Sequence, residues 1–292
     1  MVKKFIIFIS FGLSALAIWM LWNMSTFYSK QILISNSSIS NNINFLSEDN
    51  SLSGITKKEK LILNLSESLK YKTISYQDSI FSEPIHFLSF HKFLERAYPK
   101  VFSQLEKRIY SNYSILLKWK GINNTPHNPI LFMAHMDVVP IENYEQWKNP
   151  PFSGNIDNDY IWGRGALDDK SSLIAILESI EHLLNSGFSP NRDIYLAIGH
   201  DEENSGTRGN AVIADSLASE GVYFDMVIDE GSVITDGIIP NLDKPVAIVG
   251  VAEKGYASFE LLCNHESGHS SMPNNKTTIG MLAKAIVALE KN

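Results

Sequence analysis

Short apolar runs that end in acidic residues recur along the middle of this sequence, and they constrain the fold more than any other feature. Each run is short enough to be a strand, and segments with apolar residues at helical spacing lie between several of the runs. Alternating strands and helices predict an α/β fold, with a sheet that carries helices on both faces. The acid-rich points are His135-Met136-Asp137, Asp168-Asp169, Asp201-Glu202-Glu203 and Asp229-Glu230.

The expected elements extend from residue 57 to the end of the sequence. The rhythm of the first part predicts a main domain over residues 57–245. It changes at residue 246, where strand-like segments around Gly250 and Gly255 indicate the start of a smaller α+β domain over 246–292. Helices are predicted at 57–71, 85–98, 169–184, 210–220 and 277–289, and strands at 113–119, 129–135, 193–199 and 224–228.

The acidic motifs and the histidine are expected to lie close together, because ligands in such sheets gather at the carboxyl ends of the strands. Clustered carboxylates are unfavourable without compensating cations, and a divalent metal supplies that compensation. Nitrogen and oxygen ligands without sulfur suit zinc, cobalt or manganese. Each motif alone could be a capping pair, a turn or a solvated loop. Their joint order and their repeated position after apolar strands favour a metal site.

Four motifs together resemble the family of di-zinc peptidases and aminoacylases. This family includes aminoacylase, carboxypeptidase S, bacterial glutamate carboxypeptidase and succinyl-diaminopimelate desuccinylase. The resemblance covers about residues 57–292 and is nearest to the carboxypeptidase S and N-acyl-amino-acid hydrolase branch. The motifs are His135-Met136-Asp137-Val138-Val139-Pro140, Gly163-Arg164-Gly165-Ala166-Leu167-Asp168-Asp169-Lys170, Asp201-Glu202-Glu203 and Asp229-Glu230-Gly231.

The resemblance implies a zinc-exopeptidase-like sheet in an incomplete di-metal catalytic domain, followed by the beginning of a lid or dimerisation domain. It implies two Zn²⁺ ions, with Co²⁺ or Mn²⁺ as alternatives, and hydrolysis of an amide bond in small peptides or N-acyl amino acids. His135 and Asp229 would bind one zinc, Asp168 would bridge both, and Glu203 would bind the second.

The resemblance also implies three catalytic residues. Glu202 would be the general base, and Asp137 would orient His135. His269, in the segment Ser267 to Pro273, would stabilise the oxyanion from the lid. In dimeric members this histidine reaches the partner subunit, so a homodimer formed through the lid domain is a further expectation.

One departure from the family pattern bears on activity. The family's catalytic domain resumes after the lid and supplies a last metal-binding histidine, but no histidine follows His269 here. We therefore interpret the sequence as C-terminally truncated. The alternative function is an inactive, membrane-anchored fragment or binding remnant that lacks the last metal ligand.

The N-terminus predicts a membrane anchor. Lys3 and Lys4 precede residues 5–22, which carry no charge and have the length of a membrane-spanning helix. Residues 1–4 would be a cytoplasmic tip and 23–56 a linker, with the catalytic part exported to a periplasmic, lumenal or extracellular location. A cleaved signal peptide is the rival interpretation. The net charge of −7, without a basic stripe, predicts no nucleic-acid partner.

Overall fold

The computed structural model divides the chain into two compact units, Met1–Glu230 and Gly231–Asn292. Within them, the structure describes residues 18–19, 57–77, 83–122, 127–231, 234–239, 244–252, 255, 257–264, 271 and 276–291.

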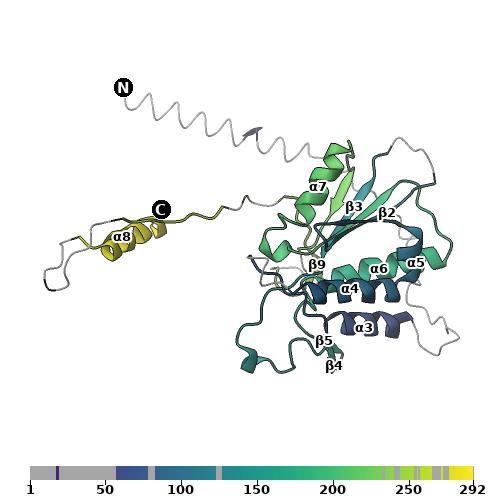
Figure 1. Ribbon diagram of the computed structural model, residues 1–292, viewed down its shortest axis with the longest axis horizontal. Coiled ribbons are helices and arrows are strands. Elements are labelled where there is room, and N and C mark those ends of the chain that lie inside the picture. The colour runs from purple at the N-terminus through teal and green to yellow at the C-terminus, as the bar shows by residue number, and fades with distance from the viewer. Residues whose placement is uncertain are drawn as a thin grey trace. The chain divides into compact units, whose positions relative to one another are not determined.

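A five-stranded mixed sheet forms the centre of the first unit, with the strand order β1-β2-β6-β3-β7 (Figure 1). Strand β3 runs parallel to both β6 and β7, whereas β2 runs antiparallel to β1 and β6. The carboxyl ends of β6, β3 and β7 therefore meet at one edge of the sheet. The strands are β1 (Glu106–Tyr110), β2 (Ser114–Trp119), β3 (Ile130–His135), β6 (Ile194–Gly199) and β7 (Met226–Ile228).

Helices cover both faces of this sheet, as the sequence predicts. Side chains alternate between the faces along each strand. Leu117 of β2 packs in one core with residues of α4, α5 and α6, whereas its neighbour Leu116 packs with Ile213 and Leu217 of α7 in a second core. Helix α3 packs mainly against α6. The helices are α3 (Lys57–Ser68), α4 (Pro84–Ala97), α5 (Pro99–Gln104), α6 (Lys170–Asn185) and α7 (Asn210–Ser219).

The larger core should dominate the stability of this unit. Leu117 is fully buried there, so Leu117→Ala removes packed methyl groups and leaves a cavity. We expect it to lower the free energy of unfolding by about 2 to 5 kcal/mol. Ile122→Ala is the control, because Ile122 is 64% exposed and should change stability by less than about 0.5 kcal/mol. Chemical denaturation of both variants measures the difference, and equal effects would contradict the assigned core.

Several small elements were not expected from the sequence. Helix α5 and strand β1 lack a strong apolar period, and tertiary packing against α6 and β2 supports them instead. A short hairpin of β4 (Asn155–Asp157) and β5 (Tyr160–Trp162) follows the 3₁₀ turn η2 (Tyr144–Gln146).

The second unit contains a strand pair, β8 (Ile234–Thr235) with β9 (Val246–Ala247), and the helix α8 (Thr278–Glu290). Thr277 caps α8, because its side-chain oxygen accepts a hydrogen bond from the backbone N–H of Gly280 at 3.1 Å. Strand β9 lies just before the strand-like segment predicted around Gly250. The described residues 248–252, 255 and 257–264 form no further strand, and the residues on either side of Gly255 lie outside the described part of the chain.

The predicted membrane anchor and exported location are corrected by the structure. In the part of the chain that the structure describes, no helix has both the length and the apolar character needed to cross a bilayer. Of the predicted span 5–22, only Ile18 and Trp19 belong to that part, and the 23–56 linker lies outside it.

Candidate metal centre

His135 ends strand β3 and is the centre of the acidic cluster. Its side chain is only 1% exposed. The ring nitrogen Nδ1 lies 3.0 Å from the backbone oxygen of Asp137 and 3.3 Å from the carboxylate oxygen Oδ1 of the same residue. Both partners are acceptors, so Nδ1 carries the proton and donates it. In the neutral ring this leaves Nε2 with a free lone pair, directed toward the other carboxylates.

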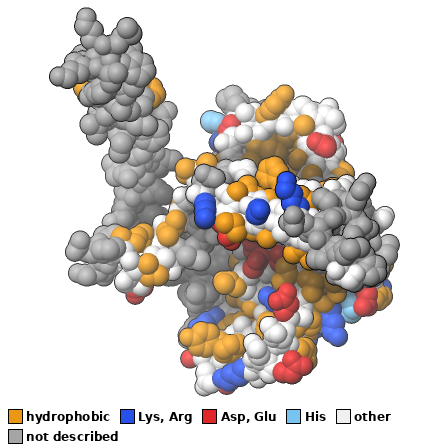
Figure 2. Space-filling model, turned by 90° about the vertical axis from the view of Figure 1, so that its left-hand side faces the viewer, with side chains coloured by type: hydrophobic (Ala, Val, Ile, Leu, Met, Phe, Trp, Pro, Cys, Tyr) orange, Lys and Arg blue, Asp and Glu red, His pale blue; other side chains and the backbone are white. Residues whose placement is uncertain are grey.

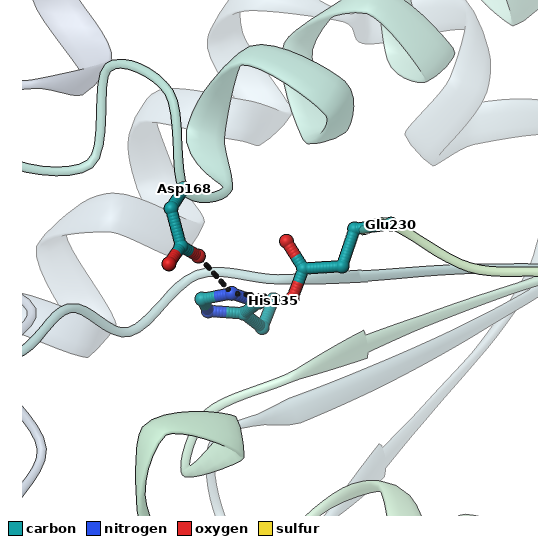
Figure 3. A group of neighbouring side chains, drawn as sticks. All are labelled: His135, Asp168 and Glu230. Atoms are coloured by element: carbon teal, nitrogen blue, oxygen red, sulfur yellow. Dashed lines mark hydrogen bonds and ion pairs between the residues drawn. The ribbon is translucent and has the colours of Figure 1, made fainter. Parts of the chain in front are cut away.

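Two carboxylates from distant parts of the sequence converge on this nitrogen (Figure 3). Asp168 Oδ1 lies 2.9 Å from Nε2, and Glu230 Oε1 lies 3.2 Å from it. One donor atom from each of the three residues can be chosen so that all lie within 4.8 Å of one another. Glu202 approaches the same nitrogen at 3.8 Å. The sheet edge therefore gathers one nitrogen donor and three acidic side chains.

A tight turn before helix α6 places Asp168. Gly165 in this turn has φ +83°, and a Cβ there would lie 2.7 Å from a methyl carbon of Val138, so a larger residue would be strained and would clash. Asp169 is buried, and its Oδ2 accepts the backbone N–H of His135 at 3.2 Å. This bond fixes the end of β3 to the start of α6, with Asp168 next to the imidazole.

Asp137 places the two glutamates that follow strand β6. Its Oδ1 accepts the backbone N–H of Glu202 at 3.1 Å, and its Oδ2 accepts that of Glu203 at 3.2 Å. These glutamates begin the 3₁₀ turn η3 (Glu202–Asn204). Asp137 is fully buried and also faces the ring of His135. One carboxylate thus holds both the imidazole and the turn that carries the glutamates.

The loop after η3 is fixed by a second buried carboxylate. Asp201 Oδ2 accepts the backbone N–H of Arg208 at 2.9 Å and lies 3.4 Å from its Nε. The guanidinium also donates to the backbone oxygen of Tyr76 at 3.1 Å. The loop therefore closes on itself and is tied to the segment that follows α3.

The crowding of negative charge perturbs the pKa values in this cluster. Burial and neighbouring carboxylates raise the pKa of Glu230 to about 7, against the opposing effect of His135. Burial also raises the pKa values of Glu202 and Glu203. For His135, burial alone would lower the pKa, but the hydrogen bond to Asp137 and the surrounding carboxylates raise it to about 10. The cluster therefore has a strong affinity for positive charge.

The donor set fits a divalent metal. One imidazole nitrogen and carboxylate oxygens are the mixed ligands that zinc accepts, and cobalt or manganese accept them as well. Within the described part of the chain, no lysine or arginine forms an ion pair with Asp168, Glu202 or Glu230. Acidic side chains also lie in a recess of the face shown in Figure 2. Among the described residues, the protonated ring of His135 is thus the cation that these carboxylates contact, and a metal ion bound at Nε2 would replace its proton.

The structure brings together most of the residues that the sequence singled out. His135, Asp137, Asp168 and Glu202 lie in one cluster, and Glu203 is close enough to Asp168 for that charge to raise its pKa. His269 lies outside the described residues.

Glu230, rather than the predicted Asp229, contacts the imidazole. Strand β7 ends at Ile228, and its last paired residue is level with Phe132 of β3. Both acids therefore lie beyond the paired part of the strand, where the ladder no longer decides which side chain faces the imidazole. Asp229 instead accepts the backbone N–H of Glu230 at 3.0 Å. The sequence supplied both acids, but not the course of the backbone after β7 that brings Glu230 to the ring.

Comparison with known proteins identifies the family. The sequence model of the peptidase family M20/M25/M40 matches residues 131–291, which include every described residue of the cluster. The chain belongs to this family. The resemblance to zinc peptidases and aminoacylases is thereby confirmed.

Three curated relatives of this M20 chain show which branch it resembles. A probable carboxypeptidase S-like 2 of Dictyostelium discoideum is 43% identical over 237 residues, covering 80% of this chain and 46% of that protein. The N-fatty-acyl-amino acid synthase/hydrolase PM20D1 of Xenopus tropicalis is 40% identical, covering 81% and 46%. Carboxypeptidase S of Saccharomyces cerevisiae is 41% identical, covering 71% and 36%. The chain thus spans about half the length of the first two relatives.

Proposed function

We propose that this M20 chain takes part in the metal-dependent hydrolysis of an amide bond, in small peptides or N-acyl amino acids. The observation that carries the proposal is the convergence of Asp168, Glu202 and Glu230 on Nε2 of the buried His135. The names of the relatives, which include carboxypeptidase S-like proteins and an N-fatty-acyl-amino acid synthase/hydrolase, support this choice of substrates.

His135, Asp168 and Glu230 would hold the first metal ion. Asp168 is 64% exposed, so part of its carboxylate remains accessible for a second ion, which it would share with Glu203. Two zinc ions, with cobalt or manganese as alternatives, remain our proposal for the occupied site. A bound metal lowers the pKa of a coordinated water and polarises the substrate carbonyl.

Glu202 would act as the general base. Its side chain is half exposed, so it can reach both solvent and substrate. Burial raises its pKa, and neighbouring acids raise it further while His135 opposes them, which makes this carboxylate a better proton acceptor. Glu202 would take a proton from the attacking water and deliver it to the leaving amine. Asp137 would keep the backbone of Glu202 in place through the 3.1 Å hydrogen bond.

We retain two further proposals for the remainder of the site. Residues 246–292 would begin a lid domain through which the protein forms a homodimer, after a catalytic domain over residues 57–245. His269 of this lid would stabilise the oxyanion of the tetrahedral intermediate.

Metal removal tests the proposed function. The 292-residue chain is assayed for bound zinc per chain and for hydrolysis of an N-acyl amino acid and a dipeptide. We expect a chelator to abolish hydrolysis and added zinc to restore it. Hydrolysis that persists without metal, or zinc binding without any hydrolysis, would contradict the proposal.

The choice between adjacent acids can be tested by a matched pair of variants. Glu230→Gln removes a charged oxygen that lies 3.2 Å from Nε2 of His135, whereas Asp229→Asn leaves that contact intact. We expect Glu230→Gln to weaken zinc binding by more than about 100-fold, because losing a direct ligand should exceed the effect of losing an outer hydrogen-bond partner. Asp229→Asn should weaken it by less than about tenfold. Calorimetric titration with zinc measures both, and the reverse order would restore Asp229 as the ligand.

Zinc affinity should rise with pH. Zinc binds the unprotonated imidazole and carboxylate, so binding must displace protons from groups whose pKa values are raised. Between about pH 7 and 10 the imidazole must lose its second proton, the one on Nε2, before zinc can bind there. This predicts a gain in zinc affinity of about tenfold per pH unit. Below about pH 7 Glu230 is protonated as well, and the dependence should be steeper. Competition with a chromophoric chelator measures this dependence, and an affinity independent of pH would contradict the charge assignments.

A further inference from the structure

Residues 73–76, which follow helix α3, lie against the loop that carries Asp137. Ile74 and Val138 form a parallel β-bridge. The backbone N–H of Ser75 donates to the backbone oxygen of Val138 at 3.2 Å, and the backbone N–H of Val138 donates to the backbone oxygen of Thr73 at 3.0 Å. The Thr73 hydroxyl donates to the backbone oxygen of Met136 at 2.6 Å. This short segment is therefore fixed beside the metal centre although it contributes none of the predicted ligands.

The Ser75 side chain joins two parts of the centre. Ser75 is 3% exposed, and its hydroxyl lies 2.6 Å from Asp137 Oδ2. The side-chain amide of Asn204 donates to the same hydroxyl at 2.7 Å. Asn204 ends the turn η3, which Glu202 and Glu203 begin. The hydroxyl thus connects the carboxylate that holds the imidazole with the turn that carries the glutamates.

The direction of these two bonds follows from donor counting. A serine hydroxyl has one proton, whereas an amide nitrogen can only donate. Because Asn204 donates to the hydroxyl, the hydroxyl proton is available to Asp137. An ionised Asp137 accepts it together with two backbone N–H groups and the imidazole Nδ1–H. Ser75 therefore supports the charged form of the carboxylate that keeps the proton of His135 on Nδ1.

We propose that Ser75 is a positioning residue of this metal centre, acting through Asp137 on the metal-facing nitrogen of His135 and on the Glu202–Glu203 turn. The proposal rests on the metal-binding role given to His135 above. Loss of an outer hydrogen-bond partner of a metal ligand weakens metal binding or activity by about 10- to 100-fold. Ser75 acts one bond further out than Asp137, so its removal should fall at the lower end, about tenfold.

The test compares two buried serines in the 292-residue chain. Ser75→Ala removes the hydroxyl at the centre. Ser66→Ala is the control, because Ser66 is 8% exposed and also donates one 2.6 Å hydrogen bond, but to the backbone oxygen of Gly154. Both variants lose a buried hydroxyl, so both should lose some thermal stability. Only Ser75→Ala should weaken zinc affinity, by about tenfold. Ser75→Thr keeps a hydroxyl and should recover most of the affinity.

Three results would overturn the proposal. The first is a zinc affinity of Ser75→Ala within about twofold of the wild type. The second is an equal loss of zinc affinity in Ser66→Ala. The third is a folded Ser75→Thr variant that does not recover zinc affinity. If Ser75→Ala does not fold, Asn204→Ala takes its place, since it removes the donor that directs the hydroxyl proton toward Asp137. Asn204→Ala should also weaken zinc binding, and an unchanged zinc affinity in this variant would overturn the proposal.

Hydrolysis gives a second measurement that separates this inference from the proposed function. Ser75 does not reach the substrate in this account, so Ser75→Ala should lower kcat about tenfold and leave KM nearly unchanged. A wild-type chain that binds zinc without hydrolysis would contradict the proposed function, and the zinc affinities alone would then decide the role of Ser75. A wild-type chain without zinc affinity would overturn both.

Discussion

Replacing His135 by alanine should abolish specific zinc binding at concentrations that saturate the wild-type chain. This result is expected because Nε2 of His135 is the point on which Asp168 and Glu230 converge. Loss of a hydrogen-bond partner of a metal ligand weakens metal binding by roughly 10- to 100-fold, and loss of the nitrogen ligand itself should weaken zinc binding by more than that. The remaining carboxylates would also stay uncompensated at the sheet edge.

A thermal shift measures the same loss independently. Zinc at about 1,000 times its dissociation constant should stabilise the wild-type chain by about 4 kcal/mol, and His135→Ala should lose nearly all of this gain. His127→Ala is the matched control, because His127 is exposed and lies outside the cluster. Equal zinc stabilisation of His135→Ala and the wild type would show that zinc binds elsewhere.

The second large effect concerns turnover rather than binding. Glu202→Gln keeps the size of the side chain but removes its ability to accept a proton. We expect hydrolysis to slow by about 10²- to 10⁴-fold, the usual contribution of a positioned general base. Zinc affinity should change little, because the carboxylate of Glu202 lies 3.8 Å from Nε2 of His135, farther than those of Asp168 and Glu230.

The control for this variant is Glu145→Gln, which makes the same chemical change at an exposed glutamate of η2. Steady-state kinetics of the zinc-loaded wild type and both variants separates the two effects. Loss of zinc binding together with activity in Glu202→Gln would make this residue a ligand. Unchanged activity would exclude it as the base.

The fold could be predicted from the sequence because its main elements have clear periods. Strand β2 alternates its side chains between two cores, and the 3.6-residue period of α6 is well marked. Helix α5 and strand β1 were missed because contacts with distant elements support them. The described residues near Gly250 show the converse, since residues 248–252 are not a strand although their sequence is strand-like.

The same division applies to the metal centre. The order of motifs and their positions after strands predicted that His135, Asp168 and Glu202 would meet. The sequence could not show that Glu230 rather than Asp229 would contact the imidazole, because both acids lie beyond the last paired residue of β7. Ser75 had no local signal at all, since its hydroxyl bonds a carboxylate 62 residues away. Contacts of this kind depend on tertiary structure, which no motif spacing records.

A crystal structure of the zinc-loaded chain, with anomalous diffraction recorded at the zinc absorption edge, tests the central claim most directly. We expect an anomalous peak within bonding distance of Nε2 of His135 and of carboxylate oxygens of Asp168 and Glu230. A zinc–nitrogen distance of about 2.1 Å and zinc–oxygen distances of about 2.0 to 2.2 Å would mark direct coordination. A peak elsewhere, or none near His135 at saturating zinc, would contradict the account.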